Sequence, residues 1–208
     1  MKYIKQYGIQ RSGTNFMRAM FEMNMDCRVL SNIGGFKHGR ITNATNMGIV
    51  KTEIPMDEIN RIDQDLQANI IPRIVVIRNP YAWVPSISRY YNKPITKEFI
   101  DQQMERYVGL NSHWAKECDS VIYYEEFMEC PEKIINQASE RFGLTRTTDK
   151  IVMPQGVMKR GGDMPAVQNI YKNIRFNYNK NNDYLTMLSR EQQNQIRDYE
   201  EQMWFLKL

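Results

Sequence analysis

Short apolar stretches and longer amphipathic stretches alternate along the chain. Within residues 73–79, Ile-Val-Val-Ile forms a continuous apolar run that is typical of a parallel strand buried on both faces. The amphipathic stretches have apolar residues three and four apart, as in a helix with one buried face. The pattern predicts strands at residues 3–9, 48–54, 73–79 and 120–124, and helices at 14–25, 56–68, 80–91, 96–117, 131–142 and 189–205.

Strands that alternate with helices predict an α/β fold with a mostly parallel central sheet. The chain has 208 residues, which is enough for one domain with a core and a cleft. We therefore expect a single three-layer domain over residues 1–208. Loops are predicted at 31–47, which is rich in Ser, Asn, Gly and Thr, and at 145–183, which contains several Gly and Pro residues.

Several helix ends have recognisable signals. Thr96 can cap the long helix that follows it, and Ser189 with a Gln three residues later resembles a capping box. Pro80 and Pro131 suit the first turn of a helix. Pro85 lies inside a predicted helix, where we expect it to shorten or kink that helix.

Composition narrows the classes of function. The net charge of +4 is modest and suits an anionic small ligand. The chain has no long basic run, so binding to nucleic acid is not expected. Cys27, Cys118 and Cys130 form no CxxC pair, which fits reduced thiols in a cytoplasmic protein. No signal peptide and no membrane span are expected. The two histidines, His38 and His113, are far apart, so no metal site is expected.

Residues 8–15 carry the strongest chemical signal. They read Gly-Ile-Gln-Arg-Ser-Gly-Thr-Asn, between a predicted strand and a predicted helix. A tight loop that leads into a helix N-terminus is an anion cradle, because backbone N–H groups and the positive end of the helix dipole converge there. Gly8 and Gly13 permit the close backbone approach, and Arg11 adds a fixed positive charge. The loop therefore predicts a phosphate or sulfate site with a P-loop-like shape.

The same loop departs from the Walker A pattern. Gly8 and Gly13 have the right separation, but Thr14 stands where the pattern has a Lys. That Lys would reach the terminal phosphates of ATP. Its absence argues against an ordinary ATPase or kinase, although a P-loop phosphotransferase remains an alternative.

A second anion site is indicated after the buried strand. Arg78 follows this strand, so its side chain should emerge at the carboxyl edge of the sheet, where open α/β sheets bind ligands. Ser86 lies eight residues further on, about two turns into the next helix. Together with residues 8–15, these side chains favour a ligand with two anionic groups.

These two motifs resemble those of the sulfotransferases that use 3′-phosphoadenosine-5′-phosphosulfate (PAPS). Residues 7–15 are similar to the family's 5′-phosphosulfate loop, and Arg-Asn-Pro at 78–80 with Ser86 is similar to its 3′-phosphate motif. The resemblance implies that Arg78 and Ser86 bind the ribose 3′-phosphate. It also implies that the 5′ end is cradled by Arg11, Ser12, Gly13, Thr14 and Asn15.

Further matches extend the resemblance along the chain. Residues 122–127, followed by Cys-Pro-Glu, are similar to the family's strand and turn before a Pro-started helix, which would place Tyr124 near the adenine. The segment Lys159, Arg160 and Gly161 weakly resembles a basic loop that closes over the 3′-phosphate. The chain departs from the family at Ala82, where Asp is common.

The resemblance implies transfer of a sulfuryl group from PAPS to a hydroxyl or amine acceptor, with PAP (3′,5′-adenosine bisphosphate) as the product and no metal ion. Glu53 stands where relatives have a His that acts as general base, so we predict Glu53 as the base. Lys51 and Arg11 are predicted to stabilise the departing phosphate, and Thr14 to bind the phosphosulfate. The alternative for Glu53 is a surface ion pair with Lys51.

The acceptor is less constrained by the sequence. A small molecule or a glycan is expected, with Lys37 and His38 as candidate contacts in the loop at 31–47. That loop, the segment after Tyr91 and residues 145–183 are the expected acceptor walls. A chain that binds PAP or PAPS without catalysis is a further alternative, because Glu53 replaces the family's His.

Overall fold

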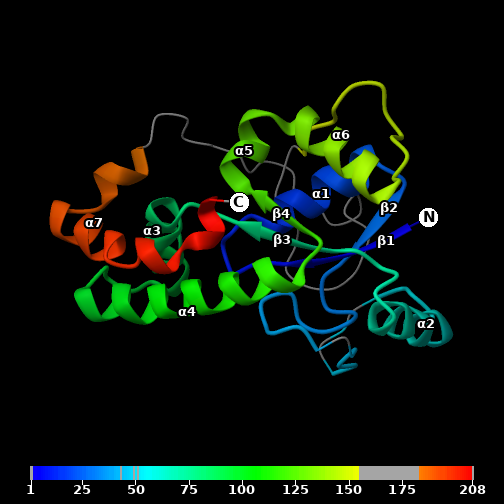
Figure 1. The fold of residues 1–208 in the computed structure, drawn as a ribbon, viewed down its shortest axis with the longest axis horizontal. Helices are drawn as coiled ribbons and strands as arrows, with labels where there is room; N and C mark the ends of the chain where they lie inside the picture. Colours follow the sequence, from blue (N-terminus) through cyan, green and yellow to red (C-terminus); the bar gives the residue numbers. More distant parts are fainter. Residues whose placement is uncertain (1, 43, 49, 51, 155–182, 208) are drawn as a thin grey trace.

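The computed structural model describes residues 2–42, 44–48, 50, 52–154 and 183–207. At its centre lies a four-stranded sheet in the order β2-β1-β3-β4, with every pairing parallel (Figure 1). The α/β fold with a parallel sheet is therefore confirmed. The strands are β1 (Lys2–Tyr7), β2 (Cys27–Leu30), β3 (Arg73–Ile77) and β4 (Ser120–Tyr123).

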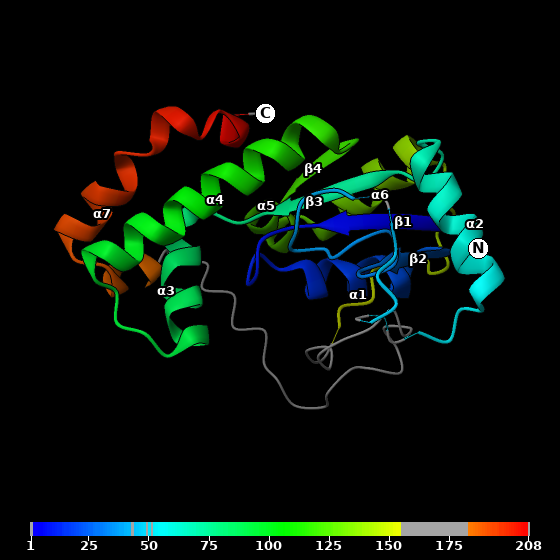
Figure 2. The same ribbon diagram turned by 90° about the horizontal axis from the view of Figure 1, so that it is seen from below.

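Helices cover both faces of the sheet. In Figures 1 and 2, α1, α5 and α6 lie on one side of it and α4 on the other, with α3 and α7 beyond its carboxyl ends. None of the helices in the described ranges is long and apolar enough to cross a membrane. The helices are α1 (Thr14–Asn24), α2 (Met56–Gln67), α3 (Pro80–Tyr91), α4 (Lys97–Glu117), α5 (Tyr124–Glu129), α6 (Pro131–Phe142) and α7 (Arg190–Arg197), and the 3-10 turns are η2 (Asp183–Met187), η3 (Glu200–Gln202) and η4 (Trp204–Lys207).

Strand β3 explains the three layers, because all five of its residues are buried. Ile74 and Val76 belong to a core cluster shared with α1 and α6, whereas Val75 and Ile77 belong to a cluster shared with α3 and α4. Successive side chains of a strand point to opposite faces, so a continuous apolar run needs a helical layer on each side.

The predicted helix caps at Thr96 and Ser189 are confirmed. The Thr96 side chain accepts a hydrogen bond from the backbone of Phe99, and Ser189 forms a complete capping box at α7. Gly143 ends α6 in the left-handed conformation. Pro85 does not shorten α3, which runs from residue 80 to 91 around it. The predicted helix at 189–205 is wrong in length, because α7 ends at Arg197 and gives way to 3-10 turns.

One predicted strand is wrong. The residues described within 48–54 lie in a turn, a bend and irregular chain, and the edge of β1 pairs instead with β2, with Ile4 opposite Val29. Ile54 is buried against α2 in a cluster with Leu30 and Leu66. The apolar residues at 48–54 thus signal packing at the edge of the sheet rather than a place in it.

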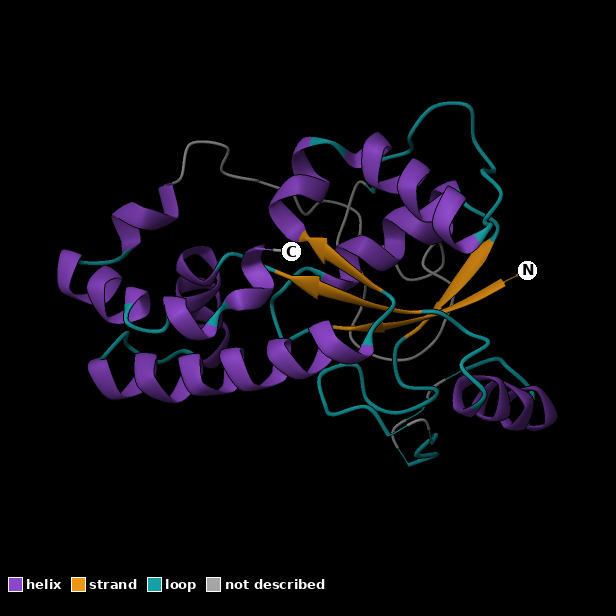
Figure 3. Ribbon diagram, viewed as in Figure 1, coloured by secondary structure: helices purple, strands orange, loops and turns teal. Residues whose placement is uncertain are grey.

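The parallel arrangement of the strands brings the segments that carry the predicted site residues close together. Because all strands run the same way, the loop after β1, the segment after β3 and the start of α5 after β4 leave the sheet at one edge (Figure 3). This edge carries both motifs that the sequence singled out.

Candidate functional site

The loop between β1 and α1 is shaped for an anion. Gly13 is the N-cap of α1 with φ +101°, and no side chain caps the helix. Arg11 also has a positive φ, +71°. The first N–H groups of α1 are therefore left without a side-chain cap, as at helix N-termini that bind phosphate.

Two hydroxyls are buried in this loop. Ser12 is fully buried and Thr14 is 5% exposed. A Cβ on Gly8 would lie 2.7 Å from both the Ser12 Oγ and the Thr14 Cγ2, so only glycine fits behind them. The Ser12 Oγ has no hydrogen-bond partner among the described residues. Buried hydroxyls in native proteins have partners, and a phosphate or sulfate oxygen would supply this one.

The two anion motifs meet in space. The Arg11 Nε donates to the Ser86 Oγ at 3.4 Å, and the Arg78 Nη1 donates to the Arg11 backbone oxygen at 3.1 Å. Ser86 is itself buried, at 4% exposure. The guanidinium groups of Arg11 and Arg78 and the Ser86 hydroxyl thus come together from the two segments that the sequence analysis paired.

Arg78 is held from several sides. Its guanidinium lies 5.1 Å from the centre of the Tyr124 ring and 4.0 Å from the Glu125 carboxylate, and the buried Tyr107 hydroxyl donates to its backbone oxygen at 2.6 Å. Burial lowers the pKa of Arg78, an effect that Tyr124 and Glu125 oppose. Burial also raises the pKa of Glu125, whose carboxylate accepts from the Asn79 N–H. A bound phosphate would give Arg78 a second negative partner beside Glu125 and would further stabilise its charged form.

Tyr124 lies directly over the start of α1. A Cβ on Gly13 would come 2.2 Å from the Cδ2 of this ring. The ring therefore covers the N-cap and contacts Arg78 at once, which joins the loop after β1 to the segment after β3.

Lys37 and His38 are brought to the same loop. The Gly8 N–H donates to the Lys37 backbone oxygen at 3.0 Å, and the Lys37 Nζ donates to the Asn15 Oδ1 at 2.5 Å. The His38 Nδ1 lies 2.5 Å from the Gly8 carbonyl oxygen. Because a carbonyl can only accept, Nδ1 carries the proton of this bond and Nε2 is left as an acceptor. Burial, followed by the charge of Lys37, lowers the pKa of His38 to about 3.

A buried lysine that the sequence analysis missed supports this segment. Lys5 is fully buried in β1, and its Nζ donates to the backbone oxygens of Ser31, Ile33 and Gly35 at 3.0, 2.8 and 2.5 Å. Lys5 follows the apolar Tyr3 and Ile4, but Gln6 next to it is also polar, so the sequence offers little sign that this lysine is buried.

The other side of the cradle is held by contacts with no sequence signal. The Trp83 Nε1 donates to the Gln10 backbone oxygen at 2.7 Å, and the Tyr91 hydroxyl donates to the Gln10 side chain at 2.6 Å. Arg106 of α4 donates to that hydroxyl at 3.2 Å. These partners lie up to 81 residues apart in the chain.

Glu53 lies apart from the hydrogen-bond network of this cluster, as far as the structure describes the chain. It is exposed in a bend before α2, and no hydrogen bond or ion pair joins it to another described residue. Lys51, Lys159, Arg160 and Gly161 lie outside the described residues, so the predicted Lys51–Glu53 pair is not tested. Within the described ranges, no three His, Cys, Asp or Glu side chains form a group that could hold a metal ion.

Comparison with known proteins supports the fold. The crystal structure of mouse sulfotransferase SULT7A1 complexed with PAP is similar to this chain with a TM-score of 0.62 and 16% sequence identity. The match covers 97% of this chain and 84% of that one. No family model and no curated protein match the sequence. The chain therefore has a sulfotransferase-like fold.

Proposed function

We propose that this protein transfers a sulfuryl group from PAPS to a hydroxyl or amine acceptor. The observation that carries the proposal is the joined pair of anion sites, in which Arg11, Ser86 and Arg78 connect the loop after β1 to the segment after β3. A nucleotide with phosphates at both its 5′ and 3′ ends matches two such sites, whereas ATP needs only one. The mouse structure with PAP has the same fold.

The donor's position follows from this pairing. The 5′-phosphosulfate lies at the N-terminus of α1, with Arg11, Ser12, Gly13, Thr14 and Asn15 around it. Arg78 and Ser86 hold the 3′-phosphate, and Tyr124 lies beside the adenine. The family resemblance, rather than this pairing, suggests Lys159, Arg160 and Gly161 as further contacts of the 3′-phosphate.

During the reaction the acceptor oxygen or nitrogen forms a bond to sulfur as the bond from sulfur to the phosphate oxygen breaks. The bond's electron pair leaves with PAP, so charge grows on the departing phosphate. The N–H groups of α1, Arg11 and Lys51 stabilise that charge without a metal ion. A general base takes the acceptor's proton.

Two residues are candidates for the base. Glu53 is the residue that the family resemblance indicates. His38 has a structural argument in its favour, because its Nε2 is left as an acceptor beside the phosphate loop. The low pKa of His38 arises from burial and neighbouring cations, and a bound dianion would raise it toward the working pH.

Variants separate these candidates. Glu53→Gln removes the carboxylate, and His38→Asn keeps a donor near the Nδ1 position while it removes Nε2. Loss of the true base should lower kcat by roughly 10²- to 10⁴-fold and leave PAP affinity within a few-fold. If Glu53→Gln turns over like the wild type, Glu53 is not the base.

Ligand binding tests the donor assignment directly. We expect PAP to raise the melting temperature, independently of Mg²⁺, and ADP to act more weakly. Arg78→Ala should weaken PAP by roughly 10- to 150-fold, since hydrogen bonds to charged groups contribute about 1.5–3 kcal/mol. Arg61→Ala is the matched control, because Arg61 is an exposed arginine on α2. A preference for Mg²⁺-ATP would instead favour a phosphotransferase. PAP binding without PAP release from PAPS over an acceptor panel would favour a binding protein.

A further inference from the structure

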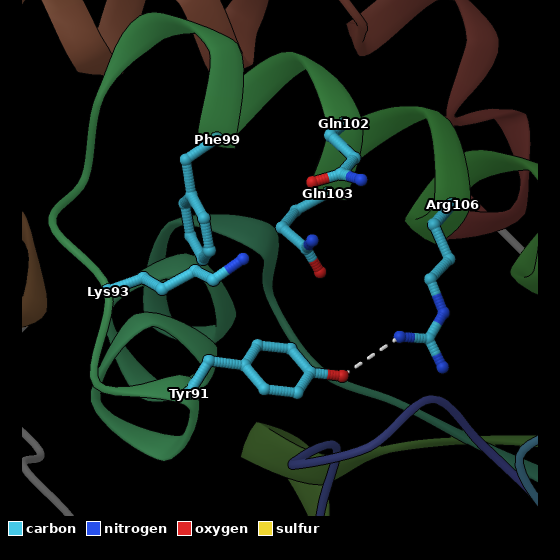
Figure 4. Close-up of a pocket in the computed structure, with 6 residues that line it drawn as sticks. All are labelled: Tyr91, Lys93, Phe99, Gln102, Gln103 and Arg106. Atoms are coloured by element: carbon cyan, nitrogen blue, oxygen red, sulfur yellow. Dashed lines mark hydrogen bonds between the residues drawn. The ribbon is translucent and has the colours of Figure 1, made fainter.

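A polar pocket lies between the end of α3 and the first half of α4. Its volume is about 440 Å³, within the range of small-molecule sites. Figure 4 shows the six residues that line it, and none of them is acidic: Tyr91, Lys93, Phe99, Gln102, Gln103 and Arg106.

Gln103 contributes a buried amide oxygen that lacks a hydrogen-bond donor among the described residues. This side chain is 7% exposed, and its Oε1 has no donor among the described residues. Figure 4 shows its amide directed into the space between Tyr91 and Arg106. A buried amide oxygen without a donor is costly, so a ligand that offers a hydroxyl or N–H here would be favoured.

The pocket also carries two positive charges. In Figure 4, Lys93 and Arg106 reach toward the pocket from opposite sides. Neither side chain has a carboxylate partner within the described ranges, and the Arg106 Nη1 donates only to the Tyr91 hydroxyl, at 3.2 Å. Two such cations favour an anionic group on the ligand.

The pocket adjoins the phosphate loop. The Tyr91 hydroxyl on its wall donates to the Gln10 side chain of that loop at 2.6 Å. Arg106 is also close enough to His38 that its charge helps to lower the pKa of that histidine. A ligand in the pocket would therefore lie beside the proposed reaction centre.

We infer that this pocket binds the sulfuryl acceptor and that the acceptor is an acidic saccharide. Such a molecule carries both a carboxylate or similar anion and free hydroxyls. The inference rests on the proposed function. The anion lies between Lys93 and Arg106, and one hydroxyl donates to the Gln103 Oε1. Another hydroxyl oxygen attacks the sulfur of PAPS and gives its proton to the base, and PAP leaves with the electrons of the broken sulfur–oxygen bond.

Glucuronate is the probe, with glucose and acetate as partial mimics that offer only the hydroxyls or only the anion. Binding to the PAP-saturated protein is measured by saturation-transfer NMR and calorimetry. We expect glucuronate to bind at least 10-fold more tightly than either mimic. Arg106→Gln and Lys93→Gln should each weaken it by roughly 10-fold, in line with hydrogen bonds to charged groups. Lys97→Gln, at an exposed lysine outside the pocket, should leave binding unchanged.

The outcomes separate the two proposals. Equal binding of glucose and glucuronate, or unchanged glucuronate binding in Arg106→Gln, would overturn the acidic-saccharide pocket while PAP binding still supports the sulfotransferase. Failure of the wild type to bind PAP would overturn the proposed function itself. The PAP-induced thermal shift of each variant reports whether it is folded, so a weakened variant that keeps this shift supports the pocket.

Discussion

Replacing Gly13 by alanine tests the geometry of the phosphate loop at its tightest point. Gly13 has φ +101°, where an L side chain is strained, and the added Cβ would lie 2.2 Å from the Tyr124 Cδ2 and 2.6 Å from its Cε2. The backbone strain costs about 1–3 kcal/mol. The ring cannot remain in place as well, because real Cβ atoms do not approach other atoms this closely.

The change in stability expected for Gly13→Ala can be compared with the change expected for alanine at a second glycine, Gly109. In a domain of this size, 1 kcal/mol shifts the melting temperature by roughly 2–4 °C, so Gly13→Ala should lower it by about 2–12 °C. Gly109 is exposed within α4, and nothing lies within 4 Å of a Cβ built on it. Gly109→Ala should therefore stabilise the protein by about 0.5–1 kcal/mol and raise the melting temperature.

The two variants should also differ in ligand binding. In Gly13→Ala the Tyr124 ring moves off the N-cap, so PAP affinity should fall, whereas Gly109→Ala should bind PAP like the wild type. Differential scanning calorimetry with and without PAP measures both effects. If Gly13→Ala matched the wild type in melting temperature and PAP affinity, the close contact between Gly13 and Tyr124 would be refuted.

Three further predictions concern other parts of the site and the fold. Tyr107→Phe removes the donor to the Arg78 carbonyl and should cost about 1–3 kcal/mol in urea unfolding, together with weaker PAP binding; unchanged values would show that Tyr107 does not position Arg78. The pKa of His38 falls from 6.5 when unfolded to about 3 when folded, so its contribution to stability is present above pH 6.5 and lost as the pH falls toward 3. Urea unfolding between pH 7 and pH 5 should show this loss, and His38→Asn should show a smaller one. Ser189→Ala breaks the capping box of α7 and should cost about 1 kcal/mol without a change in PAP affinity, which calorimetry would contradict if affinity fell.

The sequence predicted the parts of the site that depend on local order. A strand, two glycines and a helix start are neighbours in the chain, so the cradle at 8–15 could be recognised from these residues. The strand before Arg78 could be recognised in the same way, because a short uninterrupted apolar run is typical of a strand buried on both faces. Parallel strands then bring the two segments to one edge of the sheet.

The remaining parts of the fold and of the site depend on which distant segments pair. The pattern of a single sequence carries little information on such pairing. Residues 48–54 have the apolar content of a strand, but β2 occupies the edge of β1. This strand has only four residues directly after α1, too few for a clear alternation. The contacts of Gln10 with Trp83 and Tyr91 likewise join distant segments, and nothing near these residues in the sequence indicates them.

Lys5 affects how far the candidate site is ordered before a ligand binds. Its ammonium group acts much as a coordinated metal ion would, but it is tethered to the central sheet and cannot dissociate. The three backbone oxygens that it binds lie between two and six residues before Lys37, so this stretch becomes ordered when the sheet forms. The conformational entropy of that ordering is then lost on folding and is not subtracted from the affinity for a ligand. Exchange of Lys5 for an uncharged side chain would move this entropy loss from folding to binding.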